Sequence, residues 1–250
     1  YSKHRLEIYD IGRLLDRYCQ NIEREVAPDV KLAIVRKEVY NHAKDALVVT
    51  VSGGEIARIV KEYGLSLFEA NARLPLLKSP VNEEIEATLG DTSKRNRFWY
   101  FNNGLTISCR SFDWEYGRKR SILSIQEAQI LNGCQTAWTI SSHPKSLEGV
   151  EVLVRLTSVE DRKLSEAIRR ATNWQNAISE RDLRSGDFIQ KRLQVEFERL
   201  GYYYERKRNE WTLLCKARST PAMESTYPKR NLDNQRLAQL YLAFWSEKPR

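Results

Sequence analysis

Short strand-like runs and amphipathic helical segments follow one another along this chain without a regular alternation. Residues Val150 to Leu156 give the clearest strand pattern, because an apolar residue at every second position places four side chains on one face. Residues 187–200 give the contrasting helical pattern, with apolar side chains three and four positions apart. A strict strand–helix repeat would predict a parallel α/β sheet. The irregular order instead favours an α+β fold, a mixed sheet with flanking helices, and leaves α/β as the alternative.

Further strands and helices are expected from the same two kinds of spacing. The strand predictions cover residues 31–35, 47–51, 105–109, 121–131 and 202–204. The helix predictions cover residues 6–24, 53–63, 81–89, 133–140, 160–174 and 237–244, with a basic loop between the last strand and the last helix.

A polar, basic stretch at residues 90–97 indicates a boundary in the chain. We therefore expect an N-terminal α/β portion at 1–95 and a core with a C-terminal helix at 96–250. One continuous domain is the alternative. Because the sequence starts without an initiator methionine, we also expect it to be a fragment of a longer protein.

Charge and cysteine content narrow the class of protein. With 41 Lys and Arg against 33 Asp and Glu, the formal net charge is +8, which favours polyanionic partners such as nucleic acid. The four cysteines form no CxxC pair and have no histidine at ligand spacing, so neither a zinc site nor a disulfide scaffold is expected. No apolar stretch approaches the roughly 20 residues of a membrane helix. These features predict a globular, cytoplasmic protein with no membrane partner.

The first candidate site is the loop Asn102, Asn103 and Gly104. Its amide side chains can both donate and accept hydrogen bonds to a base or a phosphate, and its glycine permits a tight backbone. A plain turn is the alternative explanation of this pattern.

The second candidate site lies between a predicted strand and a predicted helix and offers Asn132, Gly133, Gln135 and Thr136. Backbone N–H groups and the positive end of the helix dipole favour an anion there, and a glycine lets a phosphate approach. The loop lacks the lysine and the glycine spacing of a Walker A motif, so a structural turn explains the bare pattern equally well.

A third segment, between two predicted helices, is rich in amide and charged side chains. Its amides, Asn173, Gln175 and Asn176, exceed what helix capping requires, because a cap takes one such residue. Arg181 and Arg184 have the charge to hold phosphates. Asp182 and Asp187 are candidates for capping or metal binding, and Asp–Arg pairing within the loop is the structural alternative.

The fourth candidate is the run from Tyr202 to Arg208, in which three tyrosines lead directly into Glu205, Arg206 and Arg208. Aromatic faces can stack on bases while cations hold phosphates, which is what single-stranded nucleic acid requires. Tyrosines on a strand also commonly face a core, so burial is the alternative.

Several long phrases stand in one order along the chain: LFEANAR at 67–73, FWYFNNGLTI at 98–107, QILNGCQT at 129–136, RATNWQN at 170–176 with RDLRS at 181–185, and GYYYERKR at 201–208. Together they resemble the AIPR family, the abortive-infection phage-resistance proteins. The resemblance covers roughly residues 65 to 248. It implies a role in bacterial defence against phage and leaves the biochemical activity open.

A more remote resemblance concerns the second loop alone. NGCQT takes the place of the Asp-Gly-Gln-(His/Gln)-Arg loop of ParB/sulfiredoxin-like proteins, which implies a core that binds nucleotides or DNA. Asn132 stands where those proteins have a carboxylate, and Thr136 where they have an arginine. Because a metal ligand and a phosphate clamp are both lost, recognition is favoured over hydrolysis by this loop.

The sequence therefore predicts a defence protein that binds nucleotide or nucleic acid through asparagine- and arginine-rich loops. One alternative is an enzyme, a metal-dependent nuclease or nucleotidase, in which Asp182, Asp187 and Glu205 would hold Mg²⁺ or Mn²⁺. The other is a sensor or scaffold that recognises a phage component or a partner in the defence system. No cofactor and no complete set of metal ligands is assigned.

Overall fold

The computed structural model describes residues 27–35, 40–71, 74–76, 79–115, 121–143, 147–159, 164, 167–168, 171, 184–229 and 231–245. The helix expected at residues 6–24 lies outside these ranges, as does most of the helix expected at 160–174.

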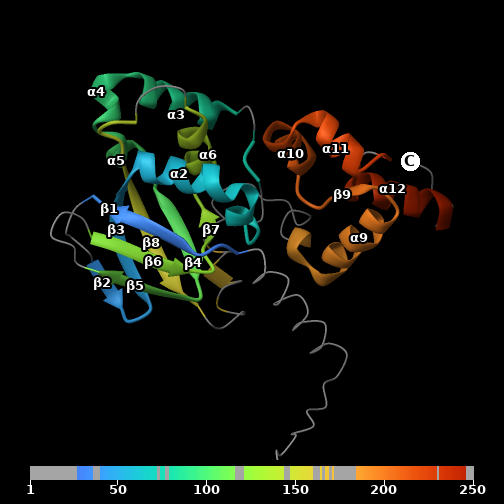
Figure 1. Ribbon diagram of the computed structural model, residues 1–250, viewed down its shortest axis with the longest axis horizontal. Coiled ribbons are helices and arrows are strands. Elements are labelled where there is room, and N and C mark those ends of the chain that lie inside the picture. The colour runs from blue at the N-terminus through green and yellow to red at the C-terminus, as the bar shows by residue number, and fades with distance from the viewer. Residues whose placement is uncertain are drawn as a thin grey trace, which may run out of the picture.

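Within the described residues, eight strands form one mixed sheet (Figure 1). They are β1 Val30–Ile34, β2 Tyr40–Ala43, β3 Ala46–Ser52, β4 Leu105–Cys109, β5 Ser111–Glu115, β6 Ser121–Gln126, β7 Gln129–Asn132 and β8 Glu151–Ser158. Their order is β5-β6-β1-β3-β8-β4-β7, with β2 paired to β3. β4 runs parallel to β8 and its other neighbour β7 is antiparallel, so the α+β prediction is confirmed. Strands from both sides of residue 95 pair directly in this sheet.

The strand pairs at the two ends of this order, β5 with β6 and β4 with β7, are the two halves of one bent hairpin. β4 and β5 are separated only by Arg110, and β6 and β7 only by Glu127 and Ala128, where Glu127 has a φ of 53°. β5 pairs with β6 beyond the bend, whereas β4 pairs with β7 before it. The single strand expected at 121–131 is therefore two strands, and the sheet curls back towards itself (Figure 1).

Strand β8 shows why the sequence pattern gives this sheet. Val150, Val152, Val154 and Leu156 are all buried, while the residues between them are more exposed, as the period of two requires. β8 pairs with β3 along seven residues, from Ala46↔Thr157 to Ser52↔Glu151. The two strands thus place one continuous apolar face against the helices.

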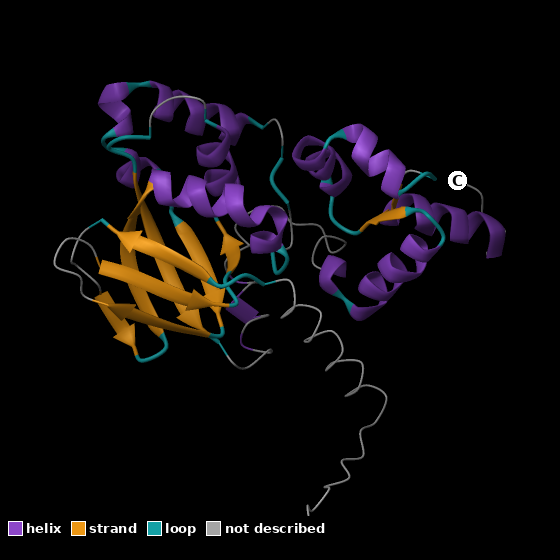
Figure 2. Cartoon of the chain, viewed as in Figure 1, coloured by secondary structure: helices purple, strands orange, loops and turns teal. Residues whose placement is uncertain are grey.

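The helical layer over this face consists of α2 Gly53–Tyr63, η1 Gly64–Phe68, α3 Pro80–Gly90 and α6 Cys134–Ser142, with the short helices α4 Thr92–Arg95 and α5 Phe98–Phe101 beside them. Figure 2 shows these helices gathered on one side of the strands. Ser52 caps α2 by accepting a hydrogen bond from the Glu55 N–H at 3.2 Å. Ile56, Ile59 and Val60 then face the core, as their helical spacing predicts.

The C-terminal part is mostly helical: η2 Arg184–Gly186, α9 Phe188–Arg199, β9 Tyr203–Glu205, α10 Glu210–Arg218, α11 Thr220–Thr226, β10 Asn231–Asp233 and α12 Asn234–Trp245. The expectation of a basic loop after β9 is wrong, because this stretch holds α10 and α11. Both helices are short, at nine and seven residues, and Leu213 and Met223 are their buried apolar residues, so the sequence pattern gave little helical signal.

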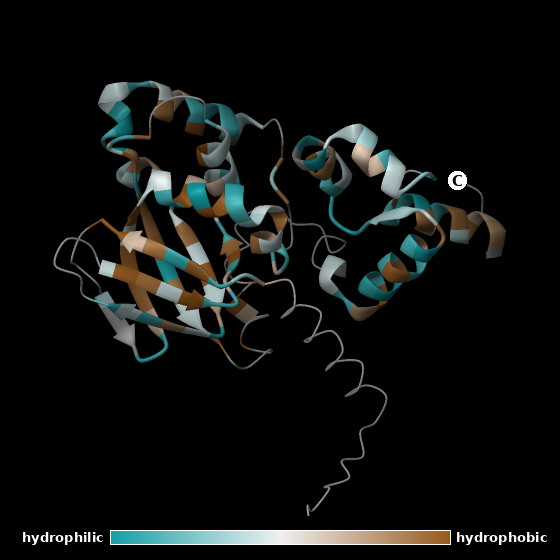
Figure 3. Cartoon of the chain, viewed as in Figure 1, coloured by the Kyte–Doolittle hydropathy of each residue, from teal (hydrophilic) through white to brown (hydrophobic). Residues whose placement is uncertain are grey.

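Helix α12 forms at the expected place, but much of its apolar side is exposed. Leu240, Tyr241 and Phe244 are 39%, 60% and 81% exposed, and Figure 3 shows apolar residues along this helix. None of the described helices combines the length and the apolar composition needed to cross a membrane.

Candidate functional site

The first two candidate loops lie against each other. Asn102 leaves α5 and Gly104 leads into β4, while Asn132 ends β7 and Gly133 precedes α6. The Asn102 amide nitrogen lies 3.1 Å from the Thr136 hydroxyl oxygen, and the Gly104 N–H donates to the Asn102 side-chain oxygen at 2.9 Å. One asparagine side chain therefore joins both loops, which we call the paired Asn–Gly loops (residues 102–104 and 132–136).

Both glycines of the paired loops are required by the backbone. Gly104 has a φ of 72° and Gly133 a φ of 89°, in the left-handed region that favours glycine. A Cβ atom on Gly133 would lie 2.5 Å from the Gly104 carbonyl oxygen, and one on Gly104 would overlap the Leu153 carbonyl. The loops therefore pack backbone against backbone, with no room for a side chain between them.

The amide side chains of the paired loops have two different roles. Asn102 joins the loops, and the Asn132 side-chain oxygen accepts a 2.7 Å hydrogen bond from the Gly133 N–H. Asn103, by contrast, is exposed, and the half-buried Gln135 has a side-chain oxygen that accepts no hydrogen bond. Two amides thus stabilise the loops, Asn103 is exposed, and the Gln135 side-chain oxygen is buried without a hydrogen-bond donor.

A surface beside these loops was not identified as a site from the sequence. Helix α5 precedes Asn102, and its residues Trp99, Tyr100 and Phe101 are 40%, 77% and 62% exposed, whereas Phe98 is buried. Basic residues occupy the preceding segment, at Lys94, Arg95 and Arg97. The signal that could have found it is a run of aromatics directly after a run of cations.

The fourth candidate segment is buried rather than exposed along most of its length. Tyr203 and Tyr204 are 4% and 1% exposed, and the Tyr204 ring stacks on Phe197 with 5.4 Å between centroids. These tyrosines belong to the core of the C-terminal part, as the alternative explanation holds. Arg208, which comes after the buried run, is exposed.

Arg206 lies in a buried cluster of charged groups. Its guanidinium donates to the Gln194 side chain at 2.7 Å, to the Ser185 carbonyl at 3.1 Å and to the Glu69 carboxylate at 2.7 Å. Lys207 is also buried, and its ammonium donates to the carbonyls of Phe68, at 3.0 Å, and of Glu69. The segment that ends η1 is therefore held by two consecutive cations of the segment after β9.

The charges in this cluster determine one another's ionisation. Burial opposes the charged form of the Glu69 carboxyl, but the positive charges of Lys207 and Arg206 outweigh it and hold the pKa of Glu69 at about 2. Burial lowers the pKa of the Lys207 ammonium and raises the pKa of the neighbouring Glu210 carboxyl. Glu69 thus lies within ion-pair distance of both buried cations, and Glu210 is a second carboxyl that interacts with them.

Side chains also fix the Glu69 segment to β7, which leads into the second Asn–Gly loop. The Gln129 amide accepts from the Ala70 N–H at 2.8 Å and donates to the Ser66 carbonyl at 2.8 Å. Asn71 donates to the Ile130 carbonyl at 3.2 Å. Four of the phrases that stand out in the sequence therefore meet: 67–73 contacts both 129–136 and 201–208, and 98–107 contacts 129–136.

A family model described as AIPR protein matches residues 68–250. The chain belongs to the AIPR family. This assignment places it among proteins associated with abortive infection and resistance to phage. The match begins at Phe68 and includes both Asn–Gly loops and the buried charge cluster. Comparisons with curated proteins and with solved structures gave no match, and the ParB/sulfiredoxin-like resemblance stays a prediction.

The remaining candidate residues of this AIPR chain are dispersed. Asp187 is exposed at the start of α9, and Glu205 is buried, with its carboxylate accepting a 3.1 Å hydrogen bond from Asn231. Burial raises the pKa of Glu205. Asn173, Gln175, Asn176, Arg181 and Asp182, together with the side chain of Arg184, lie outside the described residues. Within the described ranges, no three His, Cys, Asp or Glu side chains are grouped to hold a metal ion.

Cys134, at the start of α6, is buried. Burial raises the pKa of its thiol, and the nearby Lys207 charge offsets this only in part. A thiol held in its neutral form is a poor nucleophile, so the geometry favours a packing role for Cys134.

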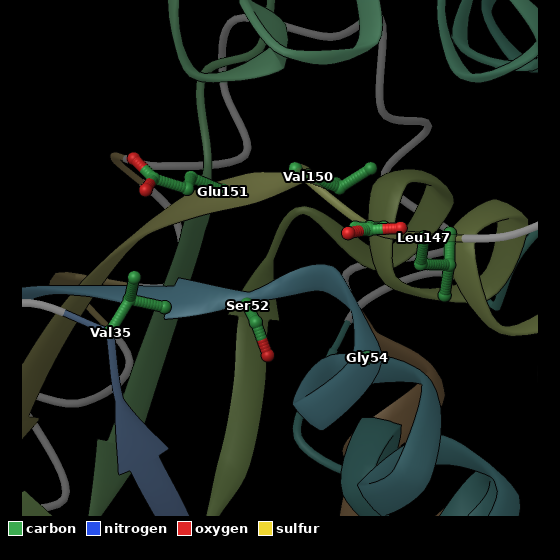
Figure 4. Close-up of a pocket in the computed structure, with 8 residues that line it drawn as sticks. Val35, Ser52, Gly54, Leu147, Val150 and Glu151 are labelled. Atoms are coloured by element: carbon green, nitrogen blue, oxygen red, sulfur yellow. The ribbon is translucent and has the colours of Figure 1, made fainter. Parts of the chain in front are cut away.

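A hollow of about 440 Å³ is lined by residues other than those of the paired loops (Figure 4). The described residues that line it include Val35, Ser52, Leu147, Glu148 and Glu151. None of the described candidate residues is among those that line it, so this hollow is not the site that the sequence predicted.

Proposed function

We propose that this AIPR chain binds nucleic acid through the paired Asn–Gly loops, as a recognition component of defence against phage. The observation that supports it is the Asn102–Thr136 hydrogen bond, which puts the loops side by side, with the exposed Asn103 amide and the unbonded oxygen of Gln135 beside it. Amide side chains recognise base edges because each offers a donor and an acceptor in one plane.

The charge of the chain supports a polyanionic ligand. The net charge of +8 attracts phosphates over a distance, and Arg208 is an exposed arginine directly after the buried Lys207. We assign Arg206 a structural role, because its guanidinium is buried and bonded to three protein groups. The cytoplasm, where a host meets invading nucleic acid, is the compartment that this function requires.

The test is a titration of labelled single strands, duplexes and nucleoside triphosphates with wild-type protein and variants at one fixed salt concentration. We expect Asn103→Ala and Gln135→Ala each to weaken binding by roughly 5- to 100-fold, since an amide–base pair contributes about 1–3 kcal/mol. Gln239→Ala is the matched control, because it removes an exposed amide from α12. Unchanged affinity in both loop variants would refute the proposed site.

The same ligands separate the alternatives. When they are incubated with the protein and Mg²⁺ or Mn²⁺, a product forms only if the protein is a nuclease or nucleotidase. If the protein is a sensor, its affinity for the phage protein should depend little on salt concentration. A surface that contacts phosphates instead loses affinity steeply as the salt concentration rises.

A further inference from the structure

Helix α5 exposes three consecutive aromatic side chains while its first residue anchors it in the core. Phe98 is 1% exposed, whereas Tyr100 and Phe101 are 77% and 62% exposed. The Trp99 and Tyr100 rings meet edge to face, with 5.3 Å between centroids and 77° between planes. Exposed apolar rings in a contiguous group mark an interaction surface, because covering them removes apolar area from water.

The charge of the chain segment that carries these rings indicates the partner. Residues 91–101 contain three basic side chains and one acidic one, Asp91. Lys94 lies 3.9 Å from Asp91 and remains 60% exposed, and Arg97 directly precedes α5 and is exposed. Aromatic faces flanked by cations match a ligand that carries planar rings on a charged backbone.

The aromatic surface is continuous with the paired Asn–Gly loops. Phe101 ends α5 and is followed by Asn102, whose side chain reaches Thr136 of the second loop. A strand whose bases stack on α5 therefore lies next to Asn103. In a duplex the base faces are covered by their neighbours, so only an unpaired strand can offer them to tyrosine or phenylalanine.

We infer that α5 is a stacking platform and that the ligand of the paired loops is single-stranded nucleic acid. This inference rests on the proposed function and narrows it to one class of ligand. The rings of Trp99, Tyr100 and Phe101 stack on bases, while Lys94 and Arg97 contact phosphates. Base identity is then recognised by the amides of the loops, since stacking itself tolerates any base.

The experiment measures the affinity of the wild type and of Tyr100→Ala and Phe101→Ala for one oligonucleotide, as a single strand and as its duplex. Matched controls are Tyr241→Ala and Phe244→Ala, which remove the same side chains from α12 at 60% and 81% exposure. Each α5 variant should bind the single strand about 5- to 100-fold more weakly and the duplex within about twofold of wild type. The α12 controls should change neither value, and Tyr100→Phe should retain single-strand affinity because it keeps the ring.

The outcomes distinguish this inference from the function on which it rests. If wild-type protein binds neither form, the proposed function fails and the inference fails with it. If Asn103→Ala weakens binding but the α5 variants do not, the proposed function stands and the stacking platform is overturned. The platform is also overturned if the α5 variants lose single-strand and duplex affinity equally. Loss of self-association with unchanged affinity would make α5 a protein interface instead, contrary to the inference.

Discussion

The Arg206 guanidinium donates a 2.7 Å hydrogen bond to the carboxylate of Glu69, 137 positions earlier in the chain. Lys207 adds a second positive charge 3.5 Å from the same carboxylate. The side chains of Arg206 and Lys207 are 5% and 1% exposed, so water compensates neither charge. The contact joins the C-terminal segment to the end of η1, and through Gln129 and Asn71 to the strand that precedes the second Asn–Gly loop.

Glu69→Gln should destabilise the fold strongly. The change removes the carboxylate that forms ion pairs with both buried cations, and removing one partner of a buried ion pair costs about 3–5 kcal/mol. Urea unfolding at neutral pH measures the loss. The control is Glu62→Gln, which breaks the exposed pair with Arg58 and should change the unfolding free energy little. Equal effects of the two variants would contradict the structural role of the cluster.

The stability that Glu69 contributes should depend on pH in a defined window. Its pKa is about 2 in the folded state against an ordinary value of 4.5, so the folded state favours the charged carboxylate. The contribution is therefore fully present above about pH 4.5 and is lost as the pH falls towards 2. The difference in unfolding free energy between wild type and Glu69→Gln should become smaller by roughly 3 kcal/mol as the pH falls through this window. A constant difference would show that the carboxylate is not held ionised by its neighbours.

Local patterns predicted the sheet and the loops better than they predicted the charge cluster. The alternation at Val150–Leu156 gave β8, because burial on one face of a strand has a period of two. Both Asn–Gly loops were placed at the ends of predicted elements, which made a shared site testable. No local pattern predicts the burial of Arg206, because an arginine that follows tyrosines is expected at the surface. Its partner Glu69 is also distant in sequence.

Two further differences have physical reasons. The run at 121–131 has strand character throughout, but the positive φ of Glu127 breaks it into β6 and β7. The aromatic run on α5 suggested no site by itself, because aromatic residues are usually buried. Only the structure shows that Phe98 is buried and that Tyr100 is exposed.

Gly104→Ala should impair both folding and binding. The substitution places a Cβ in a left-handed backbone and against the Leu153 carbonyl, so strain and overlap add. Gly64→Ala is the matched control, because Gly64 also has a positive φ, 57°, but has no atom within 4 Å of the added Cβ. We expect Gly64→Ala to cost about 1–2 kcal/mol and Gly104→Ala clearly more in urea unfolding. If the two costs are equal, the close approach at Gly104 is not a constraint.

Arg97→Gln should reduce the salt dependence of single-strand binding. Each phosphate that the protein neutralises on a single strand contributes about 0.7 to the slope of log affinity against log salt concentration, because counterions are released on binding. Removing the Arg97 charge should therefore lower that slope by about 0.7, whatever the sequence of the oligonucleotide. Arg199→Gln removes an arginine whose side chain is 71% exposed on α9 and should leave the slope unchanged. A slope that falls equally in both variants would indicate a general effect of net charge, whereas a fall in Arg97→Gln alone places a phosphate beside α5.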